Sequence, residues 1–354
     1  MKTSALMVLA LAASSLMSSG QQPRVTDSQF ESVPLSLGLS ATVDRFRHSN
    51  SPLWLGYAVQ ALPRTRLSAC SSWAGTSEVE DGCCNELRLE DTANNLNSSD
   101  QANLPAPTVY VLLRLDQGEI DRVRVTPAGC TLNAGGLHFA WLNGVGPEES
   151  AVFLGKEAEK ADGTQNHLVD ETLRALSVHA TPKATSVLIS LAGNKNSNSL
   201  REKAAFWLGA QRGHDGLLAL RQLMSGQQDN KFREKLIFDI SINSDPGAMD
   251  DLIQLAKSDN DSRVRAQALF WLAQKAGKKA MGTLNASVEN DPSLEVKKKA
   301  VFAISQLPKD ESVPQLVHIA DTNANFAIRK EAIFWLGQSQ DPRALAYIEG
   351  VLKR

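Results

Sequence analysis

The chain has 354 residues, 21% of them charged, and a formal net charge of −2. This near-neutral balance argues against a dedicated nucleic-acid-binding protein, which is usually strongly basic. The length is sufficient for two domains with buried cores. The charge is uneven, because residues 21–150 have a net charge of −6 and no Lys, whereas residues 151–354 have a net charge of +3. This change in composition predicts a domain boundary near residue 150.

The first twenty residues, MKTSALMVLALAASSLMSSG, are typical of a secretory signal peptide. Lys2 supplies the positive start, residues 5–13 the short apolar segment, and residues 18–20 the small residues for cleavage. This apolar run is too short to span a bilayer, and no later segment is apolar enough. We therefore expect a signal peptide at 1–20 and a mature chain exported to the periplasm or beyond the cell. A disordered cytosolic tail is the alternative.

Residues 21–150 predict a small β-rich domain. Alternating residues at 109–115 and 120–126, separated by DQGE, predict a β-hairpin. The segment LWLGYAVQ at 53–60 predicts a further strand, and Ala-Gly-Gly at 134–136 predicts a tight turn. An exposed loop is expected between about 90 and 107, where Asn, Ser and Pro are frequent.

All cysteines lie in this region, at Cys70, Cys83, Cys84 and Cys130. An even number in an exported chain predicts disulfides. We favour Cys70 paired with Cys83 or Cys84, and the remaining one of these two paired with Cys130. A zinc site is the alternative, but the spacing typical of zinc ligands is missing.

No motif for catalysis or nucleotide binding occurs in the chain. His48 and His138 are the histidines of the first 150 residues, and no pattern joins either of them to a cysteine as a nucleophile pair. We therefore expect no catalytic residues, no metal and no cofactor.

The second part of the chain repeats itself. The segments KAAFWLGAQ, KLIFDISIN, QALFWLAQK, KAVFAISQL and KEAIFWLGQ place a phenylalanine every 32 residues, at Phe206, Phe238, Phe270, Phe302 and Phe334. A fixed period of this size predicts stacked supersecondary units. Good helix N-cap residues recur nine residues before each phenylalanine: Ser197, Asp229, Asp261, Ser293 and Asn325. A weaker copy over 169–191 predicts an atypical first repeat.

The sequence of each repeat therefore predicts a helical hairpin. Its first helix is apolar on two sides, so it must be covered on two sides. We expect the phenylalanines to be structural core residues, hidden between layers of the stack. Second helices are expected after Gly or Pro turns, with apolar residues at Leu217 and Leu220 and at the equivalent positions of later repeats.

The pattern Asp/Ser-x-x-Val-Arg-x-x-Ala followed by Phe-Trp-Leu-Gly resembles HEAT repeats, most closely the short variety of phycobilisome-lyase-type proteins. The resemblance covers about residues 165–354 and implies a right-handed α-solenoid used as a binding scaffold. It does not imply lyase chemistry. LWLGYAVQ, GCC at 82–84 and CTLNAGGLHFAWLNGV at 130–145 also resemble secreted bacterial HEAT-repeat proteins, which implies no particular activity.

The expected fold is mainly α. A signal peptide at 1–20 and a small β-rich, disulfide-containing domain at 21–150 precede an α-solenoid at 151–354. This solenoid contains about five to six 32-residue hairpins, which begin near 165, 197, 229, 261, 293 and 325.

A basic residue recurs in the first turn of each first helix, at Arg201, Arg233, Arg265, Lys297 and Arg329. A cation in this position opposes the helix dipole. Two interpretations remain open: a ladder in which each cation meets acceptors of a neighbouring repeat, or a track for an anionic partner. Lys278, Lys279 and Lys298 belong to the densest basic cluster and are further interaction candidates. The carboxylate of Asp239 interrupts a column of Trp residues, and we expect it to pair with Lys235 one turn earlier.

These features predict an exported, non-enzymatic scaffold. Its curved surface, lined by the second helices, would bind a protein or peptide, and not nucleic acid. The alternative is an enzyme or carbohydrate-binding module in the N-terminal domain, with the repeats holding the substrate or partner.

Overall fold

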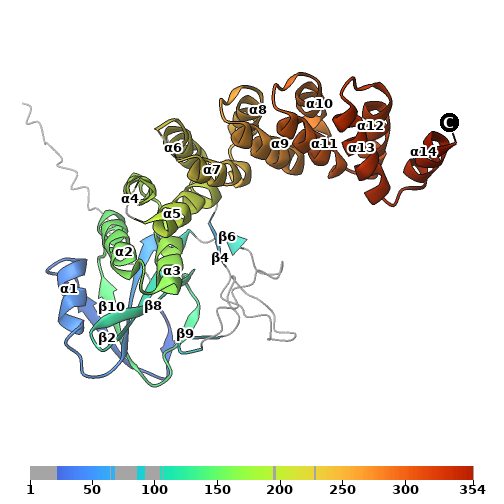
Figure 1. Cartoon of the computed structure of the whole chain (residues 1–354). Coiled ribbons are helices and arrows are strands. Elements are labelled where there is room, and N and C mark those ends of the chain that lie inside the picture. Colours follow the sequence, from blue (N-terminus) through green and yellow to red (C-terminus); the bar gives the residue numbers. More distant parts are fainter. Residues whose placement is uncertain are drawn as a thin grey trace, which may run out of the picture.

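The computed structural model of the protein (Figure 1) describes residues 22–63, 65–67, 86–91, 104–105, 107–193, 197–226 and 229–353. The signal peptide expected at 1–20 and the residues Cys70, Cys83 and Cys84 lie outside these ranges, as does most of the expected loop at 90–107. Disulfide pairing and export therefore stay predictions. Cys130 is buried in the N-terminal part.

The N-terminal part is built on a mixed β-sheet. In the described residues its strand order is β2 (Gln29–Pro34), β10 (His138–Asn143), β3 (Leu53–Gln60), β7 (Thr108–Asp116) and β8 (Glu119–Pro127). β10 is parallel to both of its neighbours, and the pairs β3–β7 and β7–β8 are antiparallel. The predicted hairpin and the strand at 53–60 are thus confirmed. Gln117 and Gly118 join β7 to β8 with positive φ values of 51° and 80°, as a tight two-residue hairpin turn requires.

Smaller elements complete this part. They are β1 (Val25–Thr26), β9 (Thr131–Asn133) and β5 (Glu86–Arg88) in one sheet, the pair β4 (Arg66–Leu67) and β6 (Leu104–Pro105), and the helix α1 (Leu39–Phe46).

Both faces of the large sheet are buried. Because side chains alternate along a strand, Leu53, Leu55 and Tyr57 of β3 pack on the helical side, whereas Trp54 packs in a second core on the other side. This second core also contains Leu132 of β9, so the small sheet covers that face. Burial on both faces explains why LWLGYAVQ is almost continuously apolar.

Helices follow from residue 147 onward. They are α2 (Pro147–Ala161), α3 (Asn166–Ser177), α4 (Pro182–Ala192), α5 (Asn198–Gln211), α6 (Gly213–Gly226), α7 (Asn230–Ile242), α8 (Gly247–Ser258), α9 (Ser262–Ala276), a 3₁₀ turn (Gly277–Ala280), α10 (Met281–Asn290), α11 (Leu294–Ser305), α12 (Lys309–Thr322), α13 (Phe326–Gln338) and α14 (Pro342–Leu352). From α3 onward they form consecutive hairpins, and the starts of the first helices agree with the predicted 32-residue register.

The predicted N-caps explain this agreement. The side chains of Ser197, Asp229, Asp261 and Asn325 each accept a hydrogen bond from a free backbone N–H in the first turn of their helix. Ser293 occupies the same position but its side chain makes no such bond. The cap residues therefore mark the start of each repeat in the sequence, and four of these five side chains stabilise that start in the structure.

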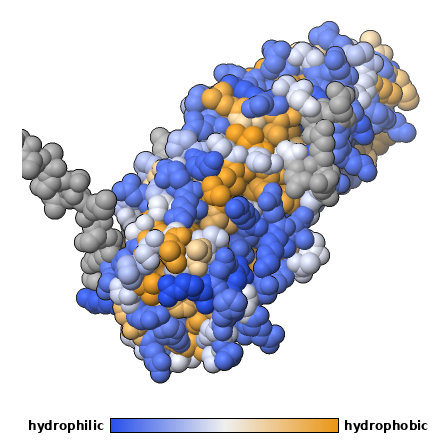
Figure 2. All heavy atoms as spheres, turned by 90° about the vertical axis from the view of Figure 1, so that its left-hand side faces the viewer, coloured by the Kyte–Doolittle hydropathy of each residue, from blue (hydrophilic) through white to orange (hydrophobic). Residues whose placement is uncertain are grey.

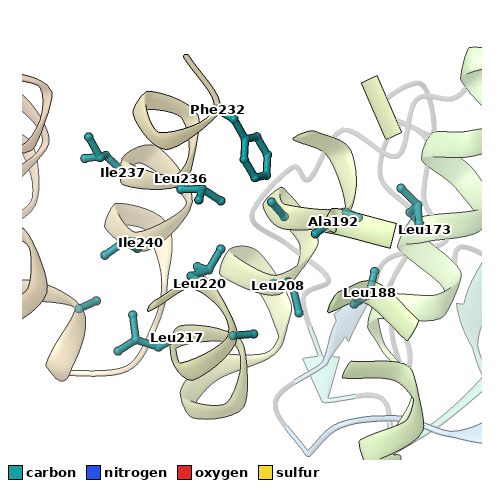
Figure 3. Close-up of a cluster of buried hydrophobic side chains, with 14 of the residues drawn as sticks. Leu173, Leu188, Ala192, Leu208, Leu217, Leu220, Phe232, Leu236, Ile237 and Ile240 are labelled. Atoms are coloured by element: carbon teal, nitrogen blue, oxygen red, sulfur yellow. The ribbon is translucent and has the colours of Figure 1, made fainter. Parts of the chain in front are cut away.

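One hydrophobic core runs from the sheet into the repeats. α3 packs on β8, where Glu171 accepts a hydrogen bond of 2.8 Å from the backbone N–H of Val123. Beyond it, Leu188, Leu208, Leu220 and Ile240 fill the interior layer after layer (Figure 3). The predicted boundary at residue 150 falls inside α2, which packs between the sheet and the first hairpin.

The repeats form an arc. In Figure 1 the first helices α5, α7, α9, α11 and α13 lie along its inner side, and the second helices α6, α8, α10 and α12 along its outer side. This differs from the expectation that second helices line the curved surface. Among the described residues, no helix combines the length and apolar character needed to cross a bilayer.

Candidate functional site

The recurring basic residues make contacts within the protein. Arg265 is only 8% exposed, and its guanidinium donates two hydrogen bonds to the carboxylate of Asp291, at 2.7 and 2.9 Å. A third bond, of 2.8 Å, reaches the backbone carbonyl of Asp259. Burial alone would raise the pKa of Asp291, but the bonds from Arg265 hold it below its ordinary value. Arg265 therefore ties the end of its own hairpin, at Asp291, to the end of the preceding one, at Asp259.

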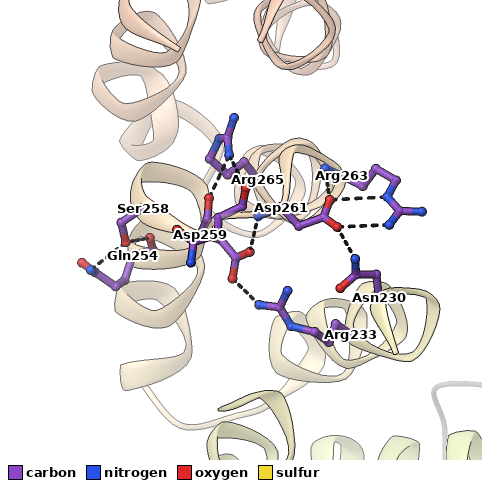
Figure 4. Close-up of polar contacts among 9 residues, drawn as sticks. Asn230, Arg233, Gln254, Ser258, Asp259, Asp261, Arg263 and Arg265 are labelled. Atoms are coloured by element: carbon purple, nitrogen blue, oxygen red, sulfur yellow. Dashed lines mark hydrogen bonds and ion pairs between the residues drawn. The ribbon is translucent and has the colours of Figure 1, made fainter. Parts of the chain in front are cut away.

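Equivalent contacts recur along the stack, and we call them the cation ladder. Arg233 donates to the carboxylate of Asp259 (Figure 4). The guanidinium of Arg201 lies 4.1 Å from the ring centroid of Phe232. Lys297 donates to the carbonyl of Glu289 at 2.7 Å, and Arg329 to the carbonyl of Asn323 at 2.8 Å. These internal contacts correspond to the ladder interpretation, and whether any of these residues also binds a partner stays untested.

The lysine cluster is more accessible. Lys278 and Lys279 are exposed in the 3₁₀ turn. Lys298 is half-buried, and its ammonium lies 3.4 Å from the carboxylate of Glu295. These three residues remain interaction candidates.

A second set of side chains follows the ladder on the same first helices. The five repeated phenylalanines and Trp207, Trp271 and Trp335 form a continuous line of rings, which we call the aromatic row. Its successive ring centroids are 4.8–6.4 Å apart in the order Trp207, Phe206, Phe238, Trp271, Phe270, Phe302, Trp335 and Phe334. Such distances are typical of favourable aromatic pairs.

The aromatic row is partly open to solvent. Its phenylalanines lie between neighbouring repeats, as expected, but they are half-buried and not hidden, and Phe334 is 53% exposed. The fully buried positions are instead two residues further along, at Leu208, Ile240, Leu272, Ile304 and Leu336. The sequence showed that aromatic residues recur but not which side of the helix they occupy.

The protein surface as a whole is not uniformly polar. On the side that faces left in Figure 1, hydrophobic residues gather in a band between polar margins (Figure 2). Exposed apolar surface of this kind marks places where a protein contacts a partner.

A pocket of about 360 Å³ lies at the N-terminal end of the aromatic row, and we call it the acidic pocket. It is lined by Phe206, Trp207 and Phe238 and by five charged residues: Asp170, Glu202, Lys203, Lys235 and Asp239. Helices α5 and α7 approach closely here, because a Cβ atom on Gly209 would lie 2.3 Å from the backbone oxygen of Asp239. Glycine therefore permits the helix contact that shapes the pocket.

Asp239 is the unusual member of this pocket. It is 3% exposed, and its Oδ2 has no hydrogen-bond partner in the part of the chain that the structure describes. Burial, with a smaller contribution from the negative charge of Glu202, raises the pKa of Asp239 to about 8. The expected pair with Lys235 is not formed: the Lys235 ammonium lies 3.8 Å from Glu202 instead.

A buried polar chain joins the N-terminal sheet to the repeats. The Tyr57 hydroxyl lies 2.8 Å from Ser150 Oγ, which in turn lies 2.8 Å from Nε2 of His179. The other ring nitrogen of His179 lies 2.8 Å from the carbonyl of Ala175. Burial lowers the pKa of His179 to about 4, so this imidazole is neutral at pH 7 and donates to that carbonyl while accepting from Ser150.

This serine–histidine pair was missed in the sequence, because its members lie far apart along the chain and match no motif. Ser150 and His179 have no exposed surface, so a substrate cannot reach them. We assign the hydrogen-bonded residues Tyr57, Ser150 and His179 a structural role where the N-terminal sheet meets the repeats. The neighbouring Arg212 supports this role by donating to the carbonyls of Ser177, His179 and Thr181 at 2.6–3.1 Å.

Other chemistry is sparse in the described residues. They contain no group of three or more His, Cys, Asp or Glu side chains placed to hold a metal ion. Nε2 of His138 lies 3.4 Å from Oε1 of Glu31, and the imidazole ring lies near the ring of Phe46, with 6.5 Å between the centroids.

Comparison with known proteins identifies the repeats. The family model for HEAT repeats matches residues 249–334 and 283–354. Residues 249–354 of the chain carry HEAT repeats. No curated protein matches it. Among solved structures, the HEAT-repeat chain is similar to the CpcE–CpcF complex of phycocyanin lyase from Nostoc, with 24% identity over 43% of this chain and 97% of that one, and a TM-score of 0.31.

Human deoxyhypusine hydroxylase in complex with glycerol is similar at 18% identity, over 58% of this chain and 90% of that one, with a TM-score of 0.30. At these TM-scores neither likeness says what the HEAT repeats of this chain bind.

Proposed function

We propose that the protein is an exported, non-enzymatic scaffold whose HEAT repeats bind a protein or peptide partner along the aromatic row. Repeat arrays of this kind present extended, curved surfaces to their partners. The observation that carries the proposal is the aromatic row itself, which consists of eight contiguous, incompletely buried rings on the helices that lie along the inner side of the arc.

Stability alone does not explain this row. The buried Leu and Ile positions two residues further along already fill the core between layers. Large aromatic side chains left partly open are the residues that most often dominate the binding energy of protein interfaces. A partner that covers the row would bury apolar surface at about 25 cal/mol per Å².

Affinity capture from a cell-envelope extract tests this function. The bait is the chain without residues 1–20, alongside a variant that changes both ends of the row, Trp207→Ser with Phe334→Ser. The matched control is Leu218→Ser, which alters an apolar residue of α6 that is 47% exposed on the outer side of the arc. Circular dichroism confirms that all three proteins are folded.

We expect the wild type and the Leu218 control to retain the same partner, and the row variant to lose at least nine-tenths of it. A partner retained equally by the row variant would contradict the proposal, as would a wild-type chain that captures nothing.

A further inference from the structure

We propose that the acidic pocket between α3, α5 and α7 binds the side chain of a Lys or Arg residue of the partner, so that the recognised segment is basic at this point. This inference rests on the function proposed above and adds the chemistry of the partner to it. Its grounds are the unpaired carboxylate of Asp239, the aromatic walls and an internal comparison within the chain.

The carboxylate of Asp239 needs a partner that the described protein does not supply. A buried carboxylate without hydrogen bonds or a counter-ion is costly, so such groups are usually paired. Asp239 lines the pocket although it is 3% exposed, and its Oδ2 is unpaired. A cationic group that enters the pocket would supply both a charge and hydrogen-bond donors.

The other charged groups that line the pocket have partners already. Lys203 donates to Asp170 and to the carbonyl of Asn166, at 3.0 and 3.1 Å. Lys235 lies 3.8 Å from Glu202. Asp239 is therefore the ionisable group of the pocket that forms no ion pair or Oδ2 hydrogen bond with the described residues.

The aromatic walls suit the same ligand. Phe206, Trp207 and Phe238 line the pocket, and their rings contact one another. A Lys or Arg side chain packs its methylene groups on such surfaces, and its cation is attracted by the rings. An uncharged amide side chain can donate a hydrogen bond to the carboxylate but brings no positive charge, and an acidic side chain is repelled by it.

The chain contains a second copy of this aromatic arrangement, 64 residues further along. Phe270, Trp271 and Phe302 repeat the geometry, with the two phenylalanine rings stacked at 5.9 Å. There the chain supplies its own cation, because the ammonium of Lys299 lies 5.6 Å from the ring centroid of Phe302.

The first copy differs at two points. Lys235, which is equivalent to Lys299, is directed to Glu202, and Asp239 replaces the equivalent Ala303. In the second copy an ammonium group lies against the phenylalanine ring. In the first copy no lysine of the described residues takes the equivalent position, and the carboxylate of Asp239 lies beside it.

The titration of Asp239 makes the proposed binding depend on pH. The pKa of Asp239 is raised to about 8, so the carboxyl is largely protonated at pH 7 and must lose its proton to pair with a cation. Binding should therefore strengthen between pH 7 and pH 9, where an arginine remains charged. The other charged groups that face Asp239 are Asp170, Glu202, Lys203 and Lys235.

The test is an NMR titration of the full chain with three short peptides. The probes are acetyl-Gly-Arg-Gly-amide, its lysine version and its uncharged glutamine version, and the readout is the indole N–H signal of Trp207. The variant Asp239→Asn removes the carboxylate of the pocket. The matched control Glu331→Gln removes a carboxylate that accepts a 2.8 Å hydrogen bond from Trp335 elsewhere on the row.

We expect the arginine or lysine peptide to shift the Trp207 signal with at least tenfold higher affinity than the glutamine peptide. Asp239→Asn should lose this preference, and Glu331→Gln should keep it. Equal affinities for the three peptides, or an unchanged preference in Asp239→Asn, would overturn the inference. Should Asp239→Asn fail to fold, the wild type decides: affinity for the arginine peptide that does not rise between pH 7 and pH 9 would overturn it.

The two proposals fail separately. Partner capture that depends on the row but not on Asp239 would leave the scaffold function and remove the basic ligand. Peptide binding in the pocket without any captured partner would support the basic ligand and contradict the scaffold function.

Discussion

The cation ladder and the aromatic row lie on the same five helices and recur with the same 32-residue period, yet Arg265 of the ladder and Asp239 beside the row differ in how completely their contacts are satisfied. In the ladder, Arg265 is buried and all its bonds go to Asp291 and to backbone carbonyls. In the row, the rings contact one another but remain partly open, and at Asp239 a carboxylate is left unpaired. Arg201 of the ladder also has two buried nitrogens, Nε and Nη2, without a hydrogen-bond partner in the described residues, and its guanidinium lies against the ring of Phe232 instead. Periodicity therefore marks a position as part of the repeat, and the contacts of each residue decide how well it is satisfied.

The largest loss of stability that separates the cation ladder from the aromatic row is expected at Arg265. The variant Arg265→Ala leaves Asp291 buried without its partner, and breaking a buried pair from one side costs about 3–5 kcal/mol. Denaturant unfolding measures this loss. The control Arg263→Ala changes a neighbouring arginine whose side chain is 57% exposed and should cost under about 1 kcal/mol. If both variants lowered the free energy of unfolding equally and only slightly, the ladder contacts would contribute no more to stability than an exposed ion pair does.

A smaller loss is expected at Gly209, where the aromatic row depends on a close helix contact. In Gly209→Ala the new methyl group would meet the backbone oxygen of Asp239, which cannot move without shifting α7. Overpacking of this kind typically costs about 1–3 kcal/mol. The control Gly282→Ala in α10 meets nothing within 4 Å and should stabilise the protein by up to about 1 kcal/mol. Stabilisation by both substitutions would refute the close contact.

Much of the repeat architecture could be predicted from sequence because its signals are local. N-cap side chains act on their own helix, and the turn at Gln117 and Gly118 lies between the strands that it joins. The partner of each ladder arginine could not be identified this way. Arg265 finds its acceptor at Asp291, 26 residues later at the end of the second helix of its own hairpin, and only the packing of the two helices brings these side chains together.

The acidic pocket shows a different limit. Asp239 stood out in the sequence because it replaces a tryptophan, but helical spacing suggested Lys235 as its partner. The structure directs that lysine to Glu202 on the preceding repeat. The chain of Tyr57, Ser150 and His179 was not predictable at all, because its three residues come from separate elements.

The smallest effect on stability is expected at the exposed end of the aromatic row. Phe334 is 53% exposed, so Phe334→Ser should lower the free energy of unfolding by less than about 1 kcal/mol. Leu336, two residues further along, is 1% exposed, and Leu336→Ala should cost about 2–5 kcal/mol. Thermal or denaturant unfolding of the two variants compares row and core directly, and a reversed order would show that the row belongs to the core.

The most direct test of the claim that Asp239 is buried without a partner is the free energy of unfolding of Asp239→Asn and wild type at pH 5 and pH 8. Burial raises the pKa of Asp239 to about 8, whereas an unfolded Asp titrates near about 3.9. Between these values the folded wild type holds a proton that the unfolded chain has released, so its stability falls as the pH rises. His179 titrates in both proteins alike and cancels in the comparison.

We predict that Asp239→Asn gains stability relative to the wild type between pH 5 and pH 8, by up to about 1.4 kcal/mol per pH unit. A difference that stays constant with pH, or that moves in favour of the wild type, would mean that the protein already satisfies this carboxylate, and the row would then hold no open place for a partner's cation.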